Sequence, residues 1–387
     1  MGETAASIRA YLEARREEMV ALLADLAAQE SPSRAADAQE AVLSRLAAAL
    51  AAAGYRARRL SGRTSGGQLF ARPARRRPRR SPAQLLLGHA DTVWPRGTLS
   101  AMPVERRDGR LYGPGVYDMK GGLVQAVFAL AALRELGLEP EAEPLLFVNS
   151  DEEIGSEDSS PRIRRLARVA CRTFVLEPSL GPEGRLKTAR KGLLRLHVRA
   201  HGRAAHAGLD PERGASAILA LAHAIQHVYT LADPARGLTV NVGLVAGGVS
   251  SNVVAPAAGC EVDVRLLWQD DATALEAAVR RFSSPVAGTT LAVENVEFRP
   301  PLEPTPRNRA LWSQAVEAAR ALGIELEEGT AGGASDGNTT SLLTATLDGL
   351  GAVGDGAHAE DEHVVIDRLP ERAALLALLL LAPVGSP

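Results

Sequence analysis

The feature that most constrains the fold is a pattern that recurs along the chain, a short apolar run that ends directly in a histidine or an acid. A run of three leucines, residues 85–87, leads through one glycine into His89 and Asp91. Runs of this length and composition predict buried strands. Polar groups just past the ends of such strands are where proteins that alternate strands and helices place their chemistry. The pattern recurs before Asp151-Glu152-Glu153, before Glu177 and before His358.

The segments between these runs alternate helix and strand, which implies a mainly parallel sheet covered by helices. Ahead of the sheet, apolar residues at helical spacing predict two helices, at 5–28 and 36–53. The predicted fold class is therefore α/β, with a mainly parallel mixed sheet. The order expected after the first strand is helix 119–136, strand 144–150, helix 161–170 and strand 173–176.

The pattern changes near Lys191, where a second module is expected to begin. Its predicted βαββαβ order describes a small α+β domain inserted into the first. A chain of 387 residues is also too long for one ordinary core. The first domain is expected to comprise residues 1–190 and 302–387, and the inserted domain residues 191–301. The inserted elements are strand 193–201, helix 212–232, strands 239–245 and 259–267, helix 272–284 and strand 289–298.

Composition and charge narrow the classes of function. With 46% hydrophobic residues and a net charge of −2, the chain is typical of a globular protein without a field that attracts nucleic acid or anionic membranes. Cys171 and Cys260 lie far apart, so neither a zinc knuckle nor a disulfide framework is indicated. No secretory signal pattern is found, and the longest apolar run, near 375–384, is too short to cross a bilayer. A cytoplasmic protein is expected.

An arginine-rich stretch, residues 72–80, precedes the leucine run. It fits either a patch that binds phosphate or nucleic acid, or a solvated hairpin loop between two strands. The balanced charge of the rest of the chain favours the hairpin loop.

The polar residues of the recurring pattern are expected to converge, because parallel strands share one carboxyl edge. Burying several carboxylates without partners would cost several kcal/mol each, which a bound divalent cation avoids. Mixed histidine and carboxylate ligands suit zinc, and cobalt or manganese less often. Two histidines and three carboxylates would serve two ions that share one carboxylate, although each residue singly could be an ordinary loop or helix-terminal side chain. The converging set is His89, Asp118, Glu152, Glu153, Glu177 and His358.

Longer segments around these residues resemble a known family. They are GHADTV, LYGPGVYDMKGG, SDEEIGS, LEPS, AHAG, SSNVVAPA with DVRL, GGASDGN and a GAH near the end. Together they resemble the aminoacylase/glutamate carboxypeptidase family of di-zinc metallopeptidases, closest to the glutamate carboxypeptidase branch. The resemblance implies a zinc-exopeptidase-like catalytic domain. It also implies that the inserted domain is a ferredoxin-like lid that forms a dimer interface.

The resemblance assigns roles to the converging residues. Asp91 would orient the ring of His89, and Asp118 would bridge the two ions, with a cis peptide bond to Met119. Glu152 would be the general base, a choice within the acidic pair that spacing alone leaves open. The ions would be two divalent metals, chiefly Zn²⁺, with Co²⁺ or Mn²⁺ as alternatives. Their ligands would be His89, Asp118, Glu153, Glu177 and His358.

In the inserted domain the resemblance assigns roles to three further residues. His206 would stabilise the oxyanion, either within its own subunit or across a dimer. Asn252 and Arg265 would hold a free α-carboxylate of the substrate, because a guanidinium matches that anion well. Closure of the lid would bring the three residues to the substrate together. Arg190 or Lys191, just before the lid, would assist in holding the α-carboxylate.

The implied reaction is hydrolysis of an amide or peptide bond next to a free α-carboxylate, in a small peptide or an N-acyl amino acid. Alternatives within this chemistry are an aminopeptidase and an N-acyl-amino-acid deacylase of the acetylornithine or succinyl-diaminopimelate type. A non-catalytic metal-binding relative is the alternative of another class. The enzyme is expected to be a homodimer without nucleic-acid or membrane partners. His363 competes with His358 as a ligand, although the strand-then-loop context favours His358.

Overall fold

The computed structural model describes residues 2–75 and 81–384, and the chain divides into two compact units. The boundaries fall at Thr188/Ala189 and Glu303/Pro304, where the sequence predicted 190/191 and 301/302. The structure also adds Ala331–Ala334 to unit 2. The backbone N–H of Lys191 donates to the carbonyl oxygen of Ala331 at 2.9 Å, a pairing that no local pattern reports. Unit 1 comprises Met1–Thr188, Pro304–Thr330 and Ser335–Pro387, and unit 2 comprises Ala189–Glu303 and Ala331–Ala334.

Unit 1 is built on a six-stranded sheet, and its mixed character is as predicted. Strands β6, β3, β7 and β14 run parallel, β2 pairs antiparallel with β6, and β1 pairs antiparallel with β2 at the edge. β3 is buried on both faces, which is why its sequence is a continuous apolar run rather than an alternation. The strand order is β1 (Tyr55–Leu60), β2 (Gln68–Pro73), β6 (Glu143–Asn149), β3 (Ala83–His89), β7 (Ala170–Val175) and β14 (Ala345–Leu347).

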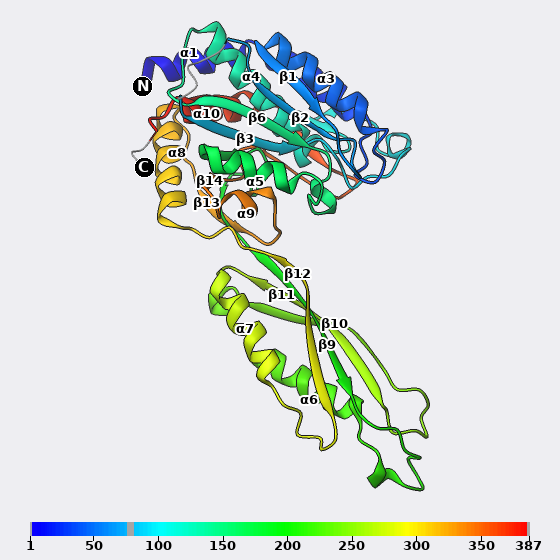
Figure 1. The fold of residues 1–387 in the computed structure, drawn as a ribbon. Helices are drawn as coiled ribbons and strands as arrows, with labels where there is room; N and C mark the ends of the chain where they lie inside the picture. The colour runs from blue at the N-terminus through cyan, green and yellow to red at the C-terminus, as the bar shows by residue number, and fades with distance from the viewer. Residues whose placement is uncertain (1, 76–80, 385–387) are drawn as a thin grey trace. The chain divides into compact units, whose positions relative to one another are not determined.

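Helices cover both faces of this sheet (Figure 1). The single helix predicted for 5–28 is wrong, because two separate helices, α1 and α2, meet at a break at Ala14-Arg15. Both bury apolar residues in the same core, so periodicity alone does not reveal the break. One face carries α1 (Gly2–Glu13), α2 (Arg16–Ala27), α3 (Gln39–Ala52), α4 (Gly121–Glu135) and α10 (Arg368–Leu381); the other carries α5 (Ser160–Val169), while α8 (Pro306–Ala321) packs against β14.

Helix α4 passes very close to the end of β7. A Cβ atom on Gly122 would lie 2.0 Å from the carbonyl oxygen of Leu176, so only glycine fits there. The stretch Val116–Glu135 is the one described segment long and apolar enough to cross a membrane. It is 89% buried, and α4 is therefore a core helix of unit 1.

The hairpin predicted for residues 72–80 is wrong. β2 and β3 are not neighbours, because β6 lies between them, antiparallel to β2 and parallel to β3. Residues 76–80 of the arginine-rich stretch lie outside the described part of the chain.

The chain forms two smaller sheets as well. The four-stranded one joins the C-terminal segment to the loop ahead of α4, in the order β15 (Gly354–Asp355), β16 (His363–Val365), β5 (Arg110–Tyr112) and β4 (Glu105–Arg107). The other pairs β8 (Leu186–Arg190) with β13 (Glu328–Ala331), ahead of the short helix α9 (Asp336–Thr340).

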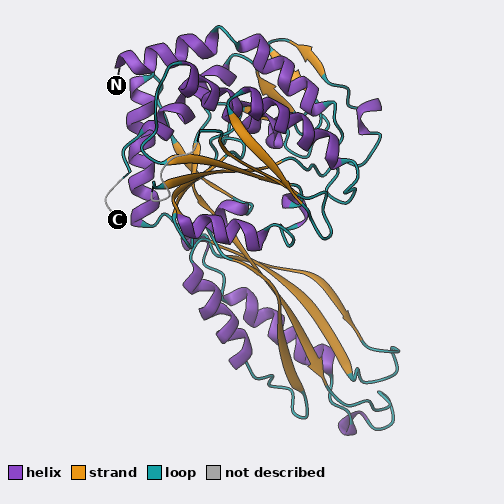
Figure 2. Cartoon of the chain, turned by 45° about the horizontal axis from the view of Figure 1, so that its top comes forward, coloured by secondary structure: helices purple, strands orange, loops and turns teal. Residues whose placement is uncertain are grey.

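Unit 2 is an antiparallel four-stranded sheet with two helices packed on one face (Figure 2). Every second residue of β9 points into that core, while the opposite face carries cross-strand ion pairs such as Arg195–Glu297. The helix predicted from residue 212 begins only at Ala217, because Ser216 is extended and caps it. The elements follow as β9 (Gly192–His201), α6 (Ala217–Thr230), β10 (Thr239–Gly247), β11 (Ala257–Leu266), α7 (Gln269–Arg281) and β12 (Thr290–Arg299), with sheet order β10-β11-β9-β12.

Candidate metal centre

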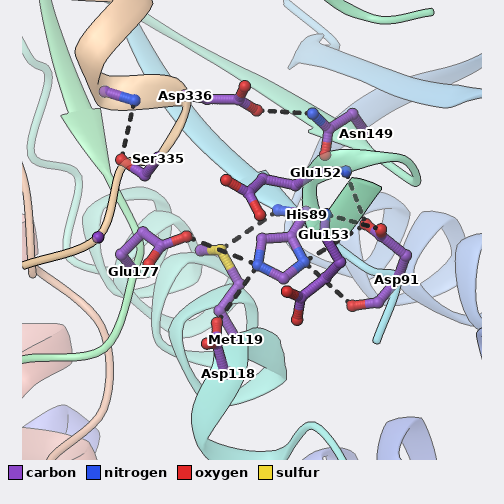
Figure 3. Close-up of polar contacts among 12 residues, drawn as sticks. His89, Asp91, Asp118, Met119, Asn149, Glu152, Glu153, Glu177, Ser335 and Asp336 are labelled. Carbon is purple, nitrogen blue, oxygen red and sulfur yellow. Dashed lines mark hydrogen bonds and ion pairs between the residues drawn. The ribbon is translucent and has the colours of Figure 1, made fainter. Parts of the chain in front are cut away.

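Five of the six polar residues predicted to converge lie together near the carboxyl ends of β3, β6 and β7 (Figure 3). The sixth, His358, joins them through its Nε2, which lies 3.1 Å from Glu153 Oε2. Strand register brings this about: His89 at the end of β3 lies opposite Asn149 at the end of β6. Leu87 lies opposite Val175, the last residue of β7. The acidic pair follows β6, and Glu177 follows β7. The local apolar pattern thus sets the strand ends, and the sheet brings them to one edge.

The ring of His89 is 1% exposed, and its two nitrogens meet different surroundings. Nδ1 lies 3.0 Å from the backbone carbonyl oxygen of Asp91 and 3.4 Å from the Asp91 carboxylate, so Nδ1 carries the proton of the neutral ring. Nε2 then turns a lone pair toward Asp118 Oδ1 at 3.3 Å and Glu177 Oε1 at 3.6 Å. Neither Nε2 nor Asp118 Oδ1 has a hydrogen-bond partner among the described residues. Buried electron pairs that face one another fit a cation between them.

Asp118 lies between two sets of candidate ligands. Its Oδ1 faces His89, whereas its Oδ2 lies 3.7 Å from His358 Nε2. The same His358 nitrogen is 3.1 Å from Glu153 Oε2. One carboxylate whose two oxygens face two ligand sets has the arrangement of a bridging ligand. The peptide bond from Asp118 to Met119 is cis, as the family resemblance implied.

Between the two competing histidines, the structure brings His358 to the cluster. His363 is 8% exposed, its Nδ1 donates to the backbone carbonyl oxygen of Asp361 at 2.8 Å, and its ring packs on Tyr112. His363 is therefore a packing residue of the small four-stranded sheet. The side chain of His358 is 51% exposed and lies against Glu153.

The carboxylate of Asp91 is fully buried and holds more than the imidazole. It accepts a hydrogen bond from Ser33 Oγ at 2.7 Å and from the backbone N–H groups of Glu152 at 3.3 Å and Glu153 at 3.2 Å. One side chain thus fixes both the ring of His89 and the turn that presents the acidic pair.

Several residues of the cluster have raised pKa values, which means that the cluster binds positive charge strongly. Burial raises the pKa of Glu152 well above its ordinary range, and nearby Glu177 raises it further. Burial also raises the pKa of Glu153, whose carboxylate in turn raises the pKa of His358 to about 9. Burial lowers the pKa of His89, but the adjoining carboxylates of Asp118, Asp91 and Glu177 reverse that effect and raise the pKa well above its ordinary value. Without a metal ion the cluster would take up protons, and a divalent cation would replace them.

Two buried acids beside the cluster carry no predicted role. Asp336 accepts hydrogen bonds from Asn149 Nδ2 and Ser156 Oγ, both at 2.6 Å, and burial raises its pKa to about 6. Glu362 accepts one from the backbone N–H of Asp118 at 2.9 Å. The glycine-rich GGASDGN segment was a signal for Asp336, but Glu362 stands in no local pattern that would single it out.

In unit 2, His206 and Asn252 lie on adjacent loops, where the backbone N–H of Ala207 donates to the carbonyl oxygen of Asn252 at 2.9 Å. The Nδ1 atom of His206 accepts hydrogen bonds from the backbone N–H groups of Gly208 and Leu209, both at 3.1 Å. Since Nδ1 is an acceptor, Nε2 of the neutral ring carries the proton and is a donor.

Arg265 does not join them within unit 2. β11 begins at Ala257, five residues after Asn252, and Arg265 lies near the other end of that strand. Eight residues of strand span about 26 Å. The guanidinium of Arg265 pairs with Asp263 at 2.8 Å. Within one copy of unit 2, Arg265 therefore lies apart from His206 and Asn252, and the roles expected for the three residues stay predictions.

Comparison with known proteins places this cluster in context. Residues 85–382 match the model of the family described as peptidase family M20/M25/M40. The chain belongs to this peptidase family. The predicted membership of a family of metal-dependent aminoacylases and carboxypeptidases is thereby confirmed, and the protein is a hydrolytic enzyme of the carboxypeptidase-like kind.

Several curated relatives and solved structures are similar to much of this chain. Carboxypeptidase G2 of Pseudomonas sp. (strain RS-16) is 29% identical over 306 residues, covering 77% of this chain and 73% of the relative. The crystal structure of aminopeptidase PepT from Bacillus cereus superposes with a TM-score of 0.77 at 20% identity, covering 94% of this chain and 98% of that one. An M20 family metallo-carboxypeptidase from Sulfolobus solfataricus has a TM-score of 0.66 at 18% identity, covering 94% and 99%. At these identities the structural likeness supports the fold alone.

Proposed function

We propose that this M20 enzyme is a di-metal hydrolase that cleaves an amide or peptide bond next to a free α-carboxylate, as a glutamate carboxypeptidase does. The observation that carries the proposal is the placement of Asp118, whose two oxygens face His89 and His358 separately. In the proposal, His89 and Glu177 hold one ion, Glu153 and His358 hold the other, and Asp118 is shared.

The donor set fits zinc. It offers imidazole nitrogens and carboxylate oxygens, and the two cysteines lie elsewhere in the chain. Bound there, two divalent ions would act as Lewis acids on the scissile carbonyl and lower the pKa of a water molecule. Cobalt or manganese would suit the same donors.

Glu152 is the proposed general base. Its backbone N–H is held by Asp91, and it is the member of the acidic pair that lies away from His358. Burial and Glu177 give this carboxyl group a strong affinity for protons. It would take a proton from water and pass it to the departing amine.

Unit 2 is the proposed ferredoxin-like lid. The Nε2–H of His206 would donate to the developing oxyanion, an interaction worth on the order of 3 kcal/mol. Asn252 and Arg265 would hold the α-carboxylate of the substrate. Because Arg265 lies about 26 Å along the sheet from the strand end next to Asn252, the proposal assigns these contacts to two different copies of unit 2.

A homodimer supplies the second copy, and β10 is the proposed interface. β10 is an edge strand, and Leu244 and Val245 on it are 63% and 62% exposed. An exposed apolar edge strand is a template for pairing with another chain. Leu244→Lys is expected to shift the protein from dimer to monomer in light scattering. A wild-type protein that is monomeric at micromolar concentration would argue against the interface.

The proposed function is tested with a matched panel of zinc-loaded assays. Dipeptides and N-acyl amino acids with a free C-terminal carboxylate are compared with the same compounds amidated at that carboxylate. Turnover of the free acids alone supports the proposal. Turnover of acetylornithine-type substrates alone supports the deacylase alternative, and a requirement for a free amino terminus supports an aminopeptidase. No turnover of any compound supports a non-catalytic metal-binding relative.

The base assignment has its own test. Glu152→Ala is expected to retain both ions and lose nearly all activity, by roughly a hundredfold to ten-thousandfold. By contrast, His89→Ala is expected to lose metal as well. Near-normal turnover by the Glu152 variant would rule out this assignment.

A further inference from the structure

The side chain of Glu362 is a buried anchor for the loop that carries Asp118. It is 1% exposed, and each carboxylate oxygen accepts two hydrogen bonds. Oε1 accepts from the backbone N–H groups of Tyr117 at 3.0 Å and Asp118 at 2.9 Å. Oε2 accepts from the backbone N–H of Gly115 at 2.9 Å and from Trp94 Nε1 at 3.1 Å. All four donors lie far from Glu362 in sequence.

Glu362 also closes the turn that presents His358. Its backbone N–H donates to the carbonyl oxygen of Ala359 at 3.1 Å, and the N–H of Ala359 donates to that of Gly356 at 2.8 Å. Gly356 has a φ of +80°, and a Cβ there would meet the backbone of Glu362 at 2.8 Å. The turn is therefore tight, and its far end is the residue that holds the Asp118 loop.

The two proposed ligand sets depend on this anchor unequally. In the first, His89 is held by Asp91, and the backbone of Glu177 is held by an N–H bond from Gly351 at 2.8 Å. This set is linked to the loop that Glu362 holds through Asp118 and through Met119, whose Sδ accepts the backbone N–H of His89 at 3.3 Å. In the second set, both Asp118 and His358 stand on segments that Glu362 holds together.

We propose that Glu362 is a positioning residue that joins the Asp118 loop to the His358 turn and thereby assembles the second ligand set. This inference rests on the proposed di-metal function. A glutamine at this position would turn an amide NH₂ toward N–H donors that now share a carboxylate oxygen. Those buried N–H donors would lose their acceptor, and the Asp118 loop would no longer be held against the His358 turn. The ion held by Glu153 and His358 should weaken most.

Metal binding rather than turnover is the direct readout. Metal-free wild type, Glu362→Gln and Glu362→Asp are titrated with Zn²⁺ by calorimetry and with Co²⁺ by visible absorption. Wild type is expected to bind two ions. Glu362→Gln is expected to keep one at wild-type affinity and to bind the other on the order of 10- to 100-fold more weakly. Glu362→Asp keeps the negative charge, and its affinity for the second ion should lie between those of the wild type and Glu362→Gln.

Asp158→Asn is the matched control. Its carboxylate likewise accepts loop N–H groups, from Arg63 at 2.7 Å and Ser65 at 3.3 Å, along with Ser65 Oγ at 2.7 Å. Among the described residues the hydrogen bonds of this carboxylate go only to the turn at 63–65, and the backbone N–H that Asp158 donates to Asp151 stays in the variant, so both ions should bind normally.

The outcomes separate the two claims. If wild type binds two ions and Glu362→Gln binds both with unchanged affinity, the positioning role is overturned. Equal weakening of both ions, with a thermal midpoint that falls more than that of Asp158→Asn, also overturns it in favour of a general structural role. If wild type itself fails to bind two ions, the proposed function fails instead.

Discussion

Asp91 touches the ring of His89 twice, through its backbone carbonyl oxygen at 3.0 Å and through its carboxylate at 3.4 Å from Nδ1. The carbonyl contact alone would fix the tautomer. The carboxylate adds a negative charge behind the ring, which makes Nε2 a stronger ligand.

The first prediction separates these two contributions. Asp91→Asn keeps the backbone contact and the shape of the side chain but removes the charge. We expect zinc affinity at the His89 set to fall by roughly 10- to 100-fold, with the second set less affected. Calorimetric titration of the metal-free protein measures this. Unchanged affinity would show that the carbonyl contact suffices.

The second prediction uses the two nearby histidines as a matched pair. His358→Ala should lose one bound ion with little change in thermal stability, because its side chain is half exposed. His363→Ala should retain both ions but unfold more easily, because it is buried against Tyr112. Metal content and thermal midpoints of both variants give the result. A loss of metal from the His363 variant alone would reverse the ligand assignment.

The third prediction concerns the pH dependence of metal binding. The carboxylate of Glu153 raises the pKa of His358 to about 9, so this imidazole is protonated at pH 7 unless a metal displaces the proton. Apparent affinity for the second ion should therefore fall as the pH drops below 9, by up to about tenfold per unit.

Calorimetry in buffers of different ionisation enthalpy should detect protons released at pH 7. The His358→Ala variant should release fewer protons when it binds metal. Equal affinity at pH 6.5 and pH 9 would contradict the argument.

The fourth prediction concerns a buried guanidinium. Arg372 on α10 is 1% exposed and donates to the carbonyl oxygens of Gly184, Gly349 and Gly351, at 2.9, 2.6 and 3.1 Å. Arg372→Met would leave those oxygens without donors, so we expect a loss of about 3–5 kcal/mol in the free energy of unfolding.

Urea denaturation measures this loss. The control is Arg9→Met, which removes a single contact, to Leu322, from an exposed side chain. The control should change the free energy of unfolding by less than about 0.5 kcal/mol. Similar values for the two variants would show that the buried donors of Arg372 contribute little.

The chain sequence by itself determined where the sheet strands end and which side chains follow them. The leucine run ahead of His89 forms a strand buried on both faces, and an apolar run can be recognised because burial is a local demand on side chains. The alternation with helices then implies parallel strands, and parallel strands bring their ends to one edge.

Only the tertiary structure decided what depends on segments far apart in the chain. It inserted β6 between β2 and β3, placed Arg265 at the far end of the sheet from Asn252, and brought Glu362 under the backbone of Asp118. Apolar periodicity records whether a residue is buried, not which distant segment buries it. Strand neighbours and buried hydrogen-bond partners are therefore fixed by packing of the whole chain, and no local pattern contains them.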